Sequence, residues 1–182
     1  MSAYRIHSIE SAPEKSKPAL HDLKQALGLI PNLAATMAES PVLISAFVGT
    51  LRNFLDGSFT IAQRQTLLLG NAVANRCAWA VAFHSTLALK EGVAPADVLA
   101  LREQRSPQDP ALAALSALTR ALIEKRGHLA ESDLSAFQRA GFGPDRVLEV
   151  IAGLALSTMA NYAGNITQPA LEAPFTAQAW HA

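Results

Sequence analysis

The chain has 182 residues, of which 50% are hydrophobic and 16% charged, so it can bury the core of one domain. Fifteen basic residues balance fifteen acidic ones, and this zero net charge argues against nucleic acid or an anionic membrane as a partner. The single cysteine, Cys77, excludes an intramolecular disulfide and is typical of a reducing compartment. Residues 1–18 lack the apolar core of a signal peptide, and no apolar run approaches the length of a membrane span, so we expect a soluble cytoplasmic protein.

The helical pattern runs through the whole chain, because no window shows sustained alternation of period two. Residues 1–16 are polar and predict an N-terminal arm that lies on a neighbouring surface or frays. Proline, glycine and capping signals then predict helices over 18–28, from 31, over 41–56, from a cap at Thr60 or Ser58 to 75, and over 77–92, 95–101, 112–125, 132–140 and 144–162. The clearest linker is 102–110. We therefore expect one all-α domain over residues 17–182, with a hint of two similar helical halves.

The rest of the chain is organised around residues 63–92. Within them, Cys77 and His84 are seven residues apart on an apolar segment. Seven residues of α-helix turn through about 700°, so the two side chains should lie about 20° apart on one face, with Ala80 between them. A polar residue, Gln65, stands twelve positions before the cysteine.

This spacing resembles the alkylhydroperoxidase D-like and carboxymuconolactone decarboxylase-like superfamily. The redox branch of that superfamily carries a Glu, a Cys-x-x-Cys pair and a His four residues further on. The residues that match here are Cys77, Val81, Ala82, His84 and Ser85, with Trp79 in the aromatic place. Two positions depart from the pattern, because Ala80 replaces the second cysteine and Gln65 stands where the Glu is expected. The resemblance covers residues 28–165 and implies the family's helical bundle and a homo-oligomer, as a dimer, trimer or hexamer.

Cys77 has two interpretations. A break at 75–76 would place it at the start of a helix, where the helix N-terminus and Arg76 lower the pKa of a thiol. On this interpretation the thiol is partly accessible and has a pKa below its usual value of about 8.5. The alternative is a small buried hydrophobe at a helix joint. The resemblance implies a peroxide-reducing thiol, served by an external thiol reductant.

His84 is a candidate base or proton donor, and its side chain leans toward the turn around Ala80. Because Ala80 carries no thiol, a water or a substrate must lie between His84 and Cys77. The alternative is a core histidine bonded to a backbone carbonyl. Gln65 can orient His84 or a ligand but, unlike a Glu, cannot take up a proton. It could equally be a polar residue on a partly solvated helix face.

The remaining candidates concern a small-molecule pocket. Trp79 offers an apolar wall with one donor, suited to a pocket, a subunit interface or the core. Tyr162 and Asn161 would face the same cavity if the closing helix packs on the central pair. The other four histidines show no metal-ligand spacing and no phosphate loop is present, so we expect no metal or cofactor.

Three functions remain open. The first is a single-thiol peroxidase of the antioxidant type, with Cys77 as the thiol and His84 as base or proton donor. The second is thiol-independent proton transfer or decarboxylation on a small carboxylic acid or lactone, centred on His84. The third is a non-catalytic member that binds a ligand or a partner protein.

Overall fold

The computed structural model describes residues 4–181, which form helices and connecting loops without a strand. The all-α prediction is confirmed. The helices in chain order are η1 (Glu14–Ser16), α1 (Lys17–Leu27), α2 (Asn32–Met37), α3 (Pro41–Leu55), α4 (Ile61–Ala74), α5 (Ala78–Lys90), α6 (Pro95–Arg102), α7 (Pro110–Glu124), α8 (Glu131–Arg139), α9 (Pro144–Thr167) and η2 (Ala173–Gln178).

Local signals set most of the helix ends. Helix α1 ends at Gly28, which adopts the left-handed conformation (φ 75°) that favours glycine. The Ser40 hydroxyl accepts the backbone N–H of Leu43 and caps α3. Thr60 and Gln63 form a reciprocal capping box at the start of α4. The sequence predicted the first two boundaries, and for the third it offered Thr60 and Ser58, of which the structure uses Thr60.

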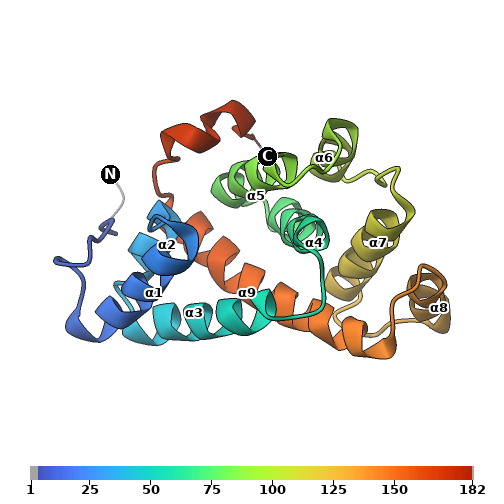
Figure 1. Ribbon diagram of the computed structural model, residues 1–182, viewed down its shortest axis with the longest axis horizontal. Helices are drawn as coiled ribbons and strands as arrows, with labels where there is room; N and C mark the ends of the chain where they lie inside the picture. The colour runs from blue at the N-terminus through green and yellow to red at the C-terminus, as the bar shows by residue number, and fades with distance from the viewer. Residues whose placement is uncertain (1–3, 182) are drawn as a thin grey trace.

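Helix α9 contacts α2, α3, α4, α5 and α7, and in Figure 1 it crosses the molecule below α4. Asn71 of α4 donates to the carbonyl of Leu154 and to the hydroxyl of Thr158, which ties the two helices together. Among the described residues, only α9 is long and apolar enough to cross a membrane by length and composition. The contacts of α9 with α2, α3, α4 and α5 place it within this helical bundle.

Two apolar clusters form the core. One lies among the N-terminal helices, α5, α6 and η2, and the other gathers the aromatic side chains around α7 and α8. Helices α3, α4 and α9 contribute to both clusters, so the two are continuous through the centre of the chain. The predicted internal duplication stays a prediction.

The two ends of the chain pack onto it as straps. In the N-terminal arm, His7 hydrogen-bonds to Glu39, and the buried Ser16 hydroxyl donates to the carbonyl of Ala38. The described part of the arm therefore lies on the chain's own α2. At the other end, η2 lies beside α5 (Figure 1), and Arg102 of α6 donates to the carbonyls of residues 178 and 179.

Candidate functional site

An apolar cavity of about 110 Å³ lies between α1, α2, α3, α4, α5 and α9. Its lining is mostly leucine, alanine and aromatic side chains. The polar exceptions among the described lining residues are Gln65 of α4, His84 of α5 and Ser157 of α9, together with the indole of Trp79. The indole N–H is bonded to Glu172 at 2.9 Å, so three polar side chains remain for a ligand.

His84 and Gln65 form a hydrogen-bonded pair in this cavity. Gln65 Oε1 lies 2.9 Å from His84 Nδ1, and because a carbonyl oxygen accepts, Nδ1 carries the proton. Among residues 4–181, the hydrogen bond of the His84 ring is the one at Nδ1, and His84 lines the cavity. Burial lowers the pKa of His84 from 6.5 to about 3. The ring is therefore neutral near pH 7, and Nε2 offers a lone pair to a ligand.

An aromatic wall backs the histidine. The Trp79 and Phe83 rings stack with centroids 5.0 Å apart, and Phe175 of η2 meets Phe83 edge-on at the same distance. Glu172 accepts the indole N–H of Trp79 and the backbone N–H of Asn32 at the start of α2. The C-terminal strap thus fixes the orientation of the wall.

Ser157 and Asn161 form a second polar pair on α9. The side-chain N–H of Asn161 donates to Ser157 Oγ at 3.1 Å. Asn161 is fully buried, and its Oδ1 has no hydrogen-bond partner among the described residues. An unpaired buried polar atom costs about 1–3 kcal/mol, so this pair departs from ordinary core packing.

Cys77 lies outside the cavity. Helix α5 begins at Ala78, and Cys77 precedes it with extended backbone angles (φ −90°, ψ 93°). Its side chain turns toward α9, where a methyl group on Gly164 would lie 2.8 Å from Sγ. The prediction that Cys77 shares a helix face with His84 is wrong, because the helix begins one residue later, at Ala78, and the backbone of Cys77 is extended.

The predicted acidity of Cys77 is wrong as well. Its side chain is only 1% exposed, and burial raises the pKa of the thiol above its usual value. The backbone N–H groups of Ala80 and Trp79 act in the opposite direction but do not outweigh burial. Arg76 adopts the left-handed conformation (φ 51°) in the turn between α4 and α5, and the thiol of Cys77 beside it stays buried. The structure supports the alternative interpretation, a small buried hydrophobe at a helix joint.

Of the other residues predicted to line the pocket, two line the cavity and one does not. Ala80 is buried in the cavity wall one turn before His84, and Trp79 lines the same cavity. Tyr162 does not reach it. That side chain is 57% exposed on the outer face of α9, because burial of Asn161 turns the next residue outward by about 100°.

Sequence reasoning missed Ser157. A polar residue four positions before the polar Asn161, within the apolar run of α9, was the available signal. The catalytic roles assigned to Gln65, Cys77 and His84 stay predictions.

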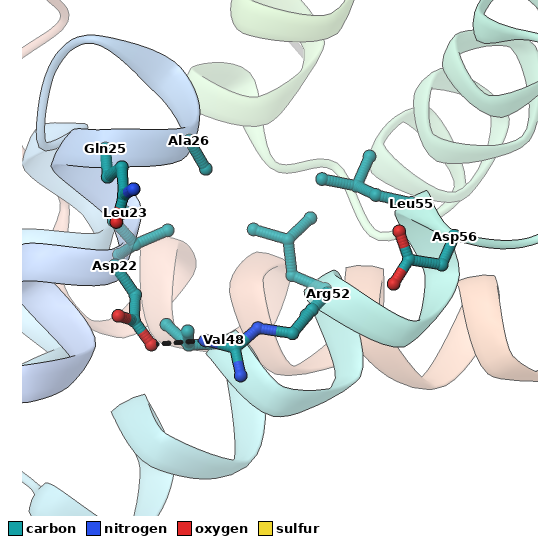
Figure 2. Close-up of a pocket in the computed structure, with 9 residues that line it drawn as sticks. Asp22, Leu23, Gln25, Ala26, Val48, Arg52, Leu55 and Asp56 are labelled. Carbon is teal, nitrogen blue, oxygen red and sulfur yellow. Dashed lines mark hydrogen bonds and ion pairs between the residues drawn. The ribbon is translucent and has the colours of Figure 1, made fainter.

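A second, more open cleft of about 350 Å³ lies outside the cavity between α1 and α3 (Figure 2). Leu23, Leu51 and Leu55 line both spaces, so they form the wall between cleft and cavity. The ion pair between Asp22 and Arg52, 2.6 Å long, joins the two helices across the cleft. Because both side chains are largely exposed, this pair contributes at most about 1 kcal/mol, and the leucines provide the main closure.

The comparison with known proteins gives both sequence and structural matches. The sequence model of the carboxymuconolactone decarboxylase family matches residues 41–124, which include Gln65, Cys77 and His84. No curated protein matches the chain significantly.

Solved structures share the fold over nearly the whole chain. An uncharacterized peroxidase-related protein with an alkylhydroperoxidase AhpD core, from Ralstonia eutropha JMP134, has a TM-score of 0.82 at 18% identity, covering 96% of this chain and 94% of its own. The debrominase Bmp8, as a C82A variant with 2,3,4-tribromopyrrole, has a TM-score of 0.79 at 20% identity, covering 98% and 96%. An uncharacterized peroxidase-related protein from Silicibacter sp. TM1040 has a TM-score of 0.77 at 14% identity, covering 97% and 93%. Residues 41–124 thus match the carboxymuconolactone decarboxylase family in sequence, and the chain as a whole shares the fold of solved structures that include an alkylhydroperoxidase AhpD core.

Proposed function

We propose that the chain binds a small, mostly apolar molecule in the His84 cavity and transfers a proton on it without using a thiol. The observation that carries this proposal is the placement of the three candidate catalytic residues. His84 and Gln65 are hydrogen-bonded inside an apolar cavity, whereas Cys77 is buried outside it.

The chemistry follows from the neutral imidazole. Nε2 accepts a hydrogen bond from an acidic O–H, N–H or C–H group, while Gln65 holds the Nδ1–H and hence the tautomer. When the proton moves to Nε2, the negative charge left on the substrate lies beside the new imidazolium. Such a neighbouring anion raises the pKa of His84 from the low value that burial gives it. The base therefore becomes stronger as the reaction proceeds.

The size and polarity of the cavity define the substrate class. Its volume of about 110 Å³ is below the ~150 Å³ of a protein cavity that holds benzene, so the ligand is limited to one small ring. Small cyclic acids and lactones, suggested by the matching family, and pyrroles, suggested by the ligand of the debrominase, both belong to this class.

The single-thiol peroxidase implied by the resemblance stays a prediction. It would require Cys77 to leave its packing against Gly164 and an external thiol to reduce it. Ala80 offers no second thiol. Steady-state peroxide consumption that is lost in Cys77→Ser would identify this activity.

The proposed function is tested with 2-acetylpyrrole, which carries an N–H donor and a methyl group made acidic by the adjacent carbonyl. Binding is measured by calorimetry, and proton transfer by exchange of the methyl hydrogens for deuterium in D₂O. Wild type and Cys77→Ser should both bind the probe and catalyse the exchange. His84→Phe, which keeps the ring shape, should bind about tenfold more weakly and lose the exchange. Loss of both signals in Cys77→Ser alone would refute the proposal.

We also propose a homo-oligomer in the cytoplasm. The outer face of α9 exposes four large apolar side chains, and the buried, unpaired Cys77 suits a reducing compartment. The four side chains are Leu148, Ile151, Tyr162 and Ile166. Light scattering should give a mass that is a multiple of 19.3 kDa, and a monomer at micromolar concentration would refute the assembly.

A further inference from the structure

We propose that Ser157, positioned by Asn161, is the hydrogen-bond donor that makes the cavity specific for ligands with an acceptor such as a carbonyl oxygen. This inference rests on the proposed function, since it requires the His84 cavity to be the ligand site. It adds a second polar anchor, on α9, to the one that His84 provides on α5.

The Ser157 hydroxyl has an unused proton. On a helix, a hydroxyl commonly donates to the carbonyl four residues earlier, as Thr66, Thr86 and Thr119 do here at 3.0, 2.9 and 2.8 Å. The Ser157 hydroxyl makes a single hydrogen bond to residues 4–181, which its oxygen accepts from the side-chain N–H of Asn161. Because Ser157 lines the cavity, its proton is available to a ligand there.

Asn161 determines the direction of this donor. Its side-chain N–H occupies a lone pair of Ser157 Oγ, which leaves the hydroxyl to donate elsewhere. Rotation of the amide by 180° would let Oδ1 accept the hydroxyl proton, but the amide N–H₂ would then lack a partner. One end of the buried amide is unpaired in either orientation. A ligand carbonyl favours the present orientation, because it completes a chain from the Asn161 N–H through the Ser157 O–H to the ligand, and such chains strengthen each other.

The two anchors together define a ligand with one donor and one acceptor on a small apolar frame. His84 Nε2 accepts from an N–H, O–H or acidic C–H, and the Ser157 O–H donates to a carbonyl. In a proton transfer from carbon, the C–H bond breaks, an N–H bond forms at Nε2, and the electron pair moves to the carbonyl oxygen. Ser157 then stabilises that developing negative charge, and return of the proton restores the starting compound.

The test compares two ligands that differ in the acceptor. Calorimetry measures the affinity for 2-acetylpyrrole and for 2-ethylpyrrole, which lacks the carbonyl. Wild type should prefer 2-acetylpyrrole, and Ser157→Ala should weaken its binding by about tenfold while leaving the affinity for 2-ethylpyrrole unchanged. Asn161→Leu, close in size, should reduce the preference through the freed hydroxyl without changing 2-ethylpyrrole binding. If Ser157→Ala does not fold, Ser157→Cys gives the same comparison, because a thiol of similar size is a weak donor.

The outcomes separate the two proposals. If 2-acetylpyrrole binds through His84 but Ser157→Ala keeps the wild-type preference, the role of Ser157 is wrong and the proposed function stands. If neither ligand binds wild type, or binding is unaffected in His84→Phe, both proposals are overturned.

Discussion

Because His84 is buried and neutral, the free energy of unfolding should fall on acidification, and replacing His84 with glutamine should remove this contribution. Burial lowers the pKa of His84 from 6.5 in the unfolded chain to about 3 in the folded one. Between these values the unfolded chain binds a proton that the folded chain does not, so the free energy of unfolding falls as the pH falls below 6.5. The slope is about 1.4 kcal/mol per pH unit, which gives about 2 kcal/mol between pH 8 and pH 5.

Urea unfolding of wild type and His84→Gln at pH 8 and pH 5 measures this contribution. The glutamine variant does not titrate, so its loss of stability on acidification should be about 2 kcal/mol smaller than that of wild type. His128→Gln, at an exposed position, serves as the matched control and should keep the wild-type pH dependence. Equal pH dependence in wild type and His84→Gln would refute the enclosed, neutral histidine.

Three further predictions concern the packing of Cys77 against α9 and the contact between Gln65 and His84. Gly164→Ala should destabilise the fold by about 1–3 kcal/mol in thermal unfolding, because the methyl would lie 2.8 Å from the sulfur of Cys77. The control Gly49→Ala, with open space around its methyl, should not destabilise the fold, and equal effects of the two changes would contradict this packing. Gln65→Glu should raise the pKa of His84 by about 3 units in an NMR titration. The size follows from an attraction of about 4 kcal/mol between unit charges ~4 Å apart at an effective dielectric constant of ~20. A pKa that stays near 3 would argue against the contact. The thiol of Cys77 should resist iodoacetamide at pH 8 in the folded chain and react in urea, so rapid labelling of the folded chain would restore the reactive-thiol hypothesis.

Helix order and most helix ends were predictable because they depend on neighbours in sequence. Gly28, Ser40 and Thr60 act on the backbone within a few residues, and the capping rules describe those contacts. The break before α5 was placed correctly to within one residue. This difference of one residue matters for the site. Cys77 is the N-cap of α5 and its side chain faces α9, so it does not lie on the same helix face as His84.

The α9 side of the site depends on packing between distant segments. The sequence could not show which face of α9 meets α4 and α5, so Tyr162 was placed at the cavity and Ser157 was overlooked. The contact of Gln65 with His84 could be expected from the sequence, because the spacing of the two residues resembles a known family and their helices are adjacent.

The most direct test of the central claim is the ¹⁵N NMR spectrum of the His84 ring at pH 7, with and without 2-acetylpyrrole. The ring should be neutral with the proton on Nδ1, and the Nε2 resonance should shift when the ligand binds, in wild type and in Cys77→Ser alike. A charged ring at pH 7, or an Nε2 resonance unchanged by a bound ligand, would contradict this claim.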